Sequence, residues 1–177
     1  SFPLGINLKF FKKNSKAKKP KNLKSPVFTF LGRVAPEKNI RAFLKCKLPG
    51  SKLIIGDGPE KEKLQNEFSK AIFVGYKKGR ALIDLLSVSD VFVFPSKTDT
   101  FGIAMLEALA CGLPVAAYNV PGPKDVITDG VDGYLGSNLE ENALRCLKLN
   151  KADCRKKALQ FSSKKWCDSF IKNLVHV

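Results

Sequence analysis

Histidine is almost absent from the sequence, and cysteine is neither paired nor clustered. The 177 residues include one histidine, His176, so a histidine-based metal site or catalytic triad is not expected. The cysteines are odd in number and include no Cys-x-x-Cys pair, which supports neither a disulfide framework nor a zinc site. Scattered single cysteines are typical of a reducing cytosol, so we expect a cytoplasmic protein. The cysteines are Cys46, Cys111, Cys146, Cys154 and Cys167.

Long hydrophobic runs are also missing. No apolar stretch approaches the ~18 residues that a membrane-spanning helix requires, and the first residues do not have the pattern of a signal peptide. The chain begins with Ser1 rather than methionine and enters a patterned segment at once. We therefore expect an excised part of a longer protein, with no membrane-spanning segment in this part.

Acidic residues are absent from residues 1–36, which contain eight lysines and Arg33. Residues 145–177 contain nine basic and two acidic residues, whereas residues 37–144 contain 13 basic and 14 acidic residues. The net charge of +15 therefore lies in the two flanks of a neutral middle. Such a charge is typical of proteins that bind nucleic acids or anionic membranes, and a lysine-rich solubilising surface is the simpler alternative.

Short apolar runs alternate with longer amphipathic stretches from residue 27 onward. Consecutive apolar residues indicate strands that are covered on both faces, and a glycine-rich turn and a helical pattern follow most of them. This alternation predicts an α/β, Rossmann-like three-layer domain with a mostly parallel six-stranded sheet. The predicted strands are residues 27–31, 52–55, 71–74, 91–94, 114–118 and 133–135. The predicted helices are residues 40–48, 60–68, 80–88, 103–111, 124–128, 140–149, 151–161 and 164–174.

Residues 11–26 are rich in lysine, asparagine, serine and proline and have no apolar period, which predicts a connecting segment with little regular structure. We therefore divide the chain into a linker over residues 1–26 and a domain over residues 27–177. Ligands of doubly wound sheets bind outside the carboxyl ends of the strands. The loops that follow the strands are the places to search for chemistry.

The loop after the first predicted strand carries two cations. Gly32 closes the strand, and Arg33 and Lys38 follow it before the next helix. The guanidinium of arginine can bind two phosphate oxygens and the ammonium of lysine is a compact point charge, while a helix N-terminus attracts anions. The pattern suits a diphosphate, although a solvated loop with ordinary surface cations remains open.

The next two loops carry weaker signals. Gly56-Asp57-Gly58-Pro59 permits a tight turn and the close approach of a ligand, but it lacks the third glycine of a dinucleotide fingerprint, and a plain turn is equally open. Gly75 and Tyr76 could present backbone groups and an aromatic ring to a base. For Tyr76, a partly buried side chain without a ligand is the simpler interpretation.

The loop after the strand at residues 91–94 is the most informative. A polar turn leads to a strongly helical run, so the amides at the helix start would face an anion or hydroxyl over the sheet. Glu107 lies in that apolar helix, where an acid is costly to bury without a partner or a task. Asp99 precedes the helix, and both acids could face one ligand; a structural salt bridge for Glu107 and a capping role for Asp99 are open alternatives. The amides at the helix start belong to Thr100, Phe101, Gly102 and Ile103.

Together these motifs resemble the C-terminal, nucleotide-sugar-binding half of a GT-B glycosyltransferase of the large retaining family 4 (group 1). Six stretches of the family's pattern occur in register. Four of them are Gly32-Arg33 with Pro36 to Asn39, Gly56 to Pro59, Phe73 to Gly75, and the signature helix with Phe101-Gly102, Glu107-Ala108, Gly112 and Pro114-Val115. Phe2 to Asn7 with Phe10 is similar to the family's interdomain stretch, and Gly133 to its closing turn.

The resemblance implies roles for individual residues. Arg33 and Lys38 are expected to bind the donor diphosphate and stabilise the leaving nucleotide, in place of a metal ion, and the sequence has no Asp-x-Asp triplet. Glu107 is expected to hydrogen-bond the ribose, the amides of residues 101–103 to hold the phosphate and the sugar, and the loop at Gly75 and Tyr76 to border the base. Asp99 departs from the family, which places glutamate there, so its contact with a sugar hydroxyl is an open question.

The resemblance also implies partners. Its members carry a second Rossmann-like domain before this one, which binds the acceptor, so we expect this chain alone to be inactive. The implied reaction transfers a hexose-type sugar from a UDP- or GDP-sugar to a lipid or saccharide acceptor, without cofactor or metal. We also expect the two basic flanks to lie together and to contact an anionic membrane at its cytoplasmic face. A basic module that binds nucleic acid or membrane and a non-catalytic nucleotide-binding scaffold are the alternatives, although no nucleic-acid motif is present.

Overall fold

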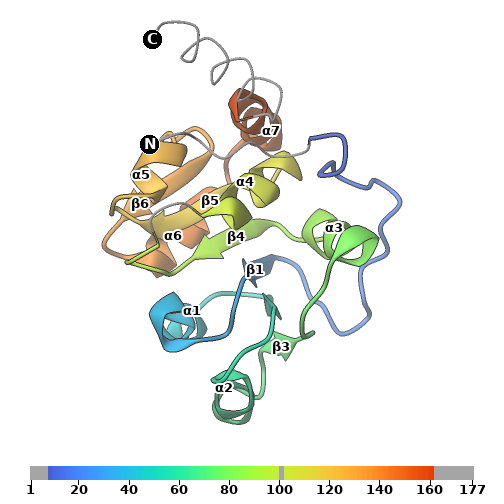
Figure 1. The fold of residues 1–177 in the computed structure, drawn as a ribbon, viewed down its shortest axis with the longest axis vertical. Helices are drawn as coiled ribbons and strands as arrows, with labels where there is room; N and C mark the ends of the chain where they lie inside the picture. The colour runs from blue at the N-terminus through green and yellow to red at the C-terminus, as the bar shows by residue number, and fades with distance from the viewer. Residues whose placement is uncertain (1–7, 100–101, 162–177) are drawn as a thin grey trace, which may run out of the picture.

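The computed structural model describes residues 8–99 and 102–161 (Figure 1). The predicted helix at residues 164–174 and the residues Thr100 and Phe101 lie outside this part. Within residues 8–26 there is no helix or strand, as predicted, yet the segment is attached to the domain. Asn14 donates through its side-chain amide to Asp84 at 2.6 Å and through its backbone amide to the Ser87 hydroxyl at 2.8 Å.

Six strands form one sheet in the order β3-β2-β1-β4-β5-β6, and every pair in it is parallel. The prediction of six strands is confirmed, and the sheet is parallel throughout rather than mostly so. The edge strand β3 is shorter than predicted because only two of its residues pair with β2. The strands are β1 (Val27–Leu31), β2 (Ser51–Ile55), β3 (Ile72–Phe73), β4 (Val91–Phe94), β5 (Val115–Tyr118) and β6 (Gly133–Gly136).

A helical segment follows each strand, and the predicted helices within the described ranges are all present with ends that differ by a few residues. Helix α1 stops at Lys45 rather than at residue 48. At the observed end, Lys52 donates from Nζ to the carbonyl oxygen of Leu44 at 2.6 Å and to that of Cys46. The helical segments are η1 (Pro36–Lys38), α1 (Ile40–Lys45), α2 (Lys61–Glu67), α3 (Gly79–Ser87), α4 (Ile103–Ala110), α5 (Pro123–Val126), α6 (Leu139–Cys146) and α7 (Lys151–Gln160).

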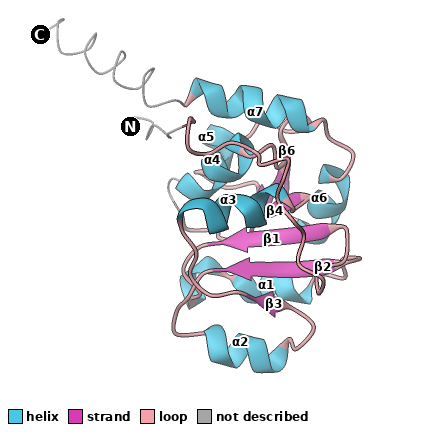
Figure 2. Ribbon diagram, turned by 90° about the vertical axis from the view of Figure 1, so that its right-hand side faces the viewer, coloured by secondary structure: helices cyan, strands magenta, loops and turns pink. Residues whose placement is uncertain are grey.

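Two apolar clusters separate the sheet from its helices and make the three layers (Figures 1 and 2). On one face α3 and α4 pack on the sheet, with α7 against α4, and on the other face α1, α2 and α6 pack on it. Successive residues of one strand serve opposite faces: Phe92 belongs to the first cluster, and Val91 and Val93 to the second. This is why the strands are apolar on consecutive residues.

Helix α7 and the first described segment lie side by side. Arg155 of α7 donates to the carbonyl oxygen of Leu8 at 2.9 Å, to that of Ala110 at 2.6 Å, and to that of Phe11. The described parts of the two basic flanks therefore meet, as expected from the sequence. In the described ranges no helix is long and apolar enough to cross a membrane.

Candidate functional site

A cavity of about 450 Å³ lies at the carboxyl ends of the two central strands, β1 and β4. It is lined by the loop after β1, the loop after β4 and the start of α4. Six of the residues singled out in the sequence meet there, although the two loops are about 60 residues apart in the chain. These six are Gly32, Arg33, Lys38, Asp99, Gly102 and Ile103.

The two cations of the cavity differ in their surroundings. Lys38 donates from Nζ to both carboxylate oxygens of Asp99, each at 2.7 Å. Arg33 is exposed, and no ion pair joins it to any of the residues that the structure describes. The charge of Lys38 is therefore already neutralised by the Asp99 carboxylate. Arg33 lines the cavity without a carboxylate partner among the described residues.

Further hydrogen bonds join the two loops beside this pair. The side-chain amide of Asn39 donates to the carbonyl oxygen of Pro95 at 3.0 Å, and the Ser96 hydroxyl donates to that of Glu37 at 3.3 Å. Asn39 has a left-handed backbone (φ 52°), which ends η1 and begins α1. Lys38 is thus the last residue of η1, and the next residue, Asn39, is hydrogen-bonded to the loop after β4.

A second cavity, of about 310 Å³, adjoins the first and shares Leu31, Gly32 and Arg33 with it. Its other walls are Ile55, Gly56, Asp57 and the exposed Tyr76. The loops behind these walls are close to one another: a Cβ added to Gly56 would lie 1.8 Å from the carbonyl oxygen of Gly32, so only glycine fits. Gly75 does not line the cavity, but its carbonyl oxygen accepts from the Gly56 amide at 3.0 Å.

The amino end of α4 forms part of the first cavity through Gly102, Ile103 and Ala104. Its N-cap is Gly102, which has no side chain to cap the helix, so the first amides of α4 lie at the cavity wall. Gly102 also packs closely, since a Cβ there would lie 2.8 to 2.9 Å from Met105 and Phe94. The arrangement allows an anion in the cavity to meet backbone N–H groups as well as side-chain cations.

Glu107 lies farther along α4 and is not among the residues that line either cavity. Desolvation raises the pKa of its carboxyl to about 7, because burial disfavours the charged form. No ion pair joins it to another residue of the described ranges. The structural salt bridge considered for Glu107 is therefore absent from this part, and a shared ligand with Asp99 stays a prediction.

Several wall residues escape sequence reasoning. Phe30 and Phe94 face the first cavity from the strand ends, and Glu37 adds a second acid to it. Ser96 and Asn39 hold the loops together. Glu37 and Asn39 belong to the same motif as Lys38, and this motif could have identified them. The local sequence does not indicate that they contact the loop after β4.

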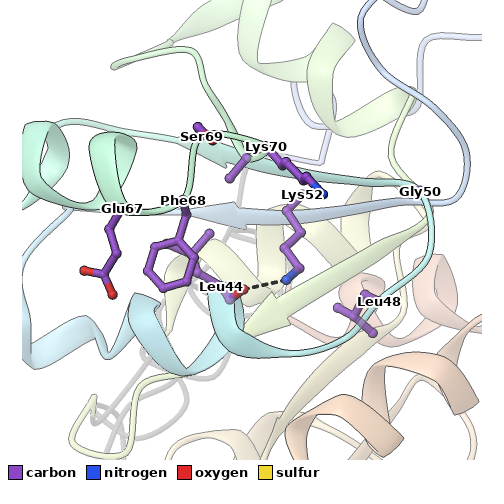
Figure 3. Close-up of a pocket in the computed structure, with 9 residues that line it drawn as sticks. Leu44, Leu48, Gly50, Lys52, Glu67, Phe68, Ser69 and Lys70 are labelled. Carbon is purple, nitrogen blue, oxygen red and sulfur yellow. Dashed lines mark hydrogen bonds between the residues drawn. The ribbon is translucent and has the colours of Figure 1, made fainter.

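Another hollow, of about 380 Å³, lies between α1 and α2 and carries different chemistry (Figure 3). Its walls include Leu44, Leu48 and Phe68, and its cation Lys52 is engaged with helix carbonyl oxygens. Across the described residues, no group of three or more histidine, cysteine, aspartate or glutamate side chains could hold a metal ion. A further hollow, lined by Lys12, Lys13, Lys151 and Arg155, also gathers cations, but it lies away from the carboxyl ends of the strands. The first cavity combines cations with the start of a helix at the carboxyl ends of β1 and β4.

Known proteins share both the sequence pattern and the fold. The family described as "Glycosyl transferases group 1" matches residues 11–145. The GDP-mannose-dependent alpha-mannosyltransferase of Mycobacterium tuberculosis is 38% identical over 112 residues, which cover 62% of this chain and 30% of that protein. Sulfoquinovosyl transferase SQD2 of Arabidopsis thaliana is 37% identical over 116 residues, covering 63% and 23%. The matched region is thus less than a third of either relative's length.

Solved structures agree on the fold. Sucrose-phosphate synthase from Thermosynechococcus elongatus superposes with a TM-score of 0.83 at 23% identity, over 99% of this chain and 51% of that one. The pneumococcal O-GlcNAc transferase GtfA, solved with UDP and GlcNAc, gives 0.74 at 23% identity, over 86% and 36%. The expected fold is therefore confirmed, and the chain belongs to the group 1 glycosyltransferases, with the Rossmann-like fold of the GT-B enzymes.

Proposed function

We propose that this chain is the donor-binding half of a retaining glycosyltransferase that uses a UDP- or GDP-sugar. The observation that carries the proposal is the first cavity, where Arg33, Lys38 and the uncapped start of α4 converge. Two cations and the amides of a helix start can bind the oxygens of a diphosphate. They can also stabilise the negative charge of the nucleoside diphosphate when it leaves the sugar. The adjoining cavity beside Tyr76 has room for the base.

The relatives support this donor class. One is named for its dependence on GDP-mannose, and GtfA was solved with UDP. By analogy, Arg33 and Lys38 bind the diphosphate without a metal ion, and Glu107 binds the ribose. The transferred group is a hexose-type sugar and the acceptor is a lipid or saccharide. We further propose that a separate acceptor domain is required, so that this chain alone shows no turnover in a transfer assay.

We test donor binding by calorimetric titration of the chain with UDP and GDP. We expect one of the two to bind, and Arg33→Ala to weaken that binding at least tenfold, because a charge-assisted bidentate contact contributes about 1.5–3 kcal/mol. EDTA is expected to leave the affinity unchanged. The matched control is Arg41→Ala, which removes an arginine that pairs with Glu67 outside both cavities. Absence of binding by both nucleotides, or equal losses in the two variants, would contradict the proposal.

We also propose that the protein is cytoplasmic and that its basic flanks attach it to an anionic membrane. Arg155 brings residues 8–11 against α7, so the lysine-rich segment begins beside the basic residues of this helix. The eight lysines of residues 9–24 are all exposed. A nucleic-acid partner is the competing candidate for this surface, and a duplex or single-stranded DNA titration that shows tight, salt-dependent binding would favour it.

A further inference from the structure

Lys38 and Asp99 lie opposite each other across the mouth of the first cavity. The ammonium contacts both carboxylate oxygens at 2.7 Å, and both side chains line the cavity. Lysine has three N–H donors, of which two are directed at Asp99. One donor is therefore left for a ligand, although Lys38 is one of the two cations on which the proposed diphosphate site depends.

The charges of the cavity walls show how the Lys38–Asp99 pair affects an anionic ligand. Arg33 and Lys38 are balanced by Glu37 and Asp99, so the walls are formally neutral. A diphosphate that carries two or more negative charges and approaches Lys38 meets the carboxylate of Asp99 next to the ammonium. Like charges in contact repel one another, although the partial exposure of the pair lets solvent reduce the effect. Full use of Lys38 by the ligand thus requires Asp99 to move away from it.

The loop is built so that the side chain of Asp99 can leave while the backbone stays. The Ser96 hydroxyl accepts from the backbone amides of Thr98 at 3.4 Å and Asp99 at 3.3 Å, and it also contacts the carbonyl oxygen of Glu37. None of these bonds involves the Asp99 carboxylate. The side chains of Lys38 and Asp99 are 23% and 28% exposed, so solvent screens the pair and breaking it costs little.

We propose that Asp99 is an internal counter-ion that the donor diphosphate displaces from Lys38. In the free protein the carboxylate holds the ammonium in the cavity, and on binding the phosphate oxygens take its place. Asp99 is therefore a positioning residue for Lys38 that also lowers the affinity of the site for anions. The inference rests on the proposed function, since it concerns the same site.

Calorimetric titration of the 177-residue chain with UDP, GDP and inorganic pyrophosphate tests the exchange. Asp99→Asn removes the competing charge and is expected to tighten binding about two- to fivefold, the range of a partly exposed ion pair. A merely structural role would have the opposite sign, because a loosened loop weakens binding. Asp99→Ser serves the same purpose if Asp99→Asn does not fold, and Lys38→Gln is expected to weaken binding.

The control is Asp153→Asn, which removes the same charge from an ion pair with Lys156 (3.1 Å) on α7. Binding in this variant is expected to stay within a factor of two of the wild type. If UDP or GDP binds the wild type and Asp99→Asn does not tighten it, the exchange is overturned while the proposed function stands. If only pyrophosphate binds, and the variant tightens it, the exchange stands while the proposed function fails. No binding by any of the three probes overturns both.

Discussion

At the residue scale, Glu107 is a carboxyl group on an apolar helix, and burial raises its pKa to about 7. A raised acid pKa means that the folded state binds more protons than the unfolded state, so this group makes the fold less stable as pH rises from 4.5 to about 7. Glu107→Gln removes the cost, and we expect it to stabilise the chain by ~2 kcal/mol at pH 8 and by little at pH 4.5. Urea unfolding at both pH values measures this, with the exposed Glu62→Gln as control. A gain that does not change with pH would contradict it.

At the element scale, the turns after β1 and β2 lie in contact directly before Arg33. The carbonyl oxygen of Gly32 lies 1.8 Å from where a Cβ on Gly56 would be, and Gly56 has a φ of 149°. We expect Gly56→Ala to separate the two turns, to cost about 2–4 kcal/mol of unfolding free energy and to weaken nucleotide binding. Gly79→Ala is the control, since its φ of 62° imposes strain of about 1 kcal/mol but nothing lies within 4 Å. Equal losses in chemical denaturation would show that crowding at Gly56 is unimportant.

At the scale of the whole molecule, the distribution of charge is the main feature. Arg155 of α7 contacts the backbone of Leu8 and Phe11, at the start of the lysine-rich segment. If that segment binds anionic lipid, each exposed lysine contributes about 1 kcal/mol. We therefore expect a fourfold Lys→Gln variant to lose about a hundredfold or more in sedimentation with vesicles of phosphatidylserine and phosphatidylcholine. The control removes four exposed lysines from the neutral middle. Equal losses, or no binding by the unaltered chain, would contradict the membrane proposal. The variant changes Lys12, Lys13, Lys16 and Lys18, and the control changes Lys45, Lys47, Lys63 and Lys70.

The fold could be predicted because its signals are local. Each strand shows consecutive apolar residues and most end in glycine, and each helix has its own apolar face, so burial by the neighbouring layer appears within one short segment. Element ends were harder to predict: α1 ends three residues early, and Lys52 of β2 donates to the carbonyl oxygens at that end. Arg33, Lys38 and the start of α4 were identified for the same local reason, since each follows a strand.

The layers, the six strands, the family pattern and the loops with cations follow from the amino-acid sequence alone. Three contacts between distant residues follow only from the folded chain: Lys38 with Asp99, 61 residues away, Gly56 with Gly32, and Arg155 with Leu8, 147 residues away. The two differ because hydrophobic periodicity reflects burial on an element's own face. Contacts between loops depend instead on strand order, which places β1 beside β4 and so brings two distant turns to one cavity.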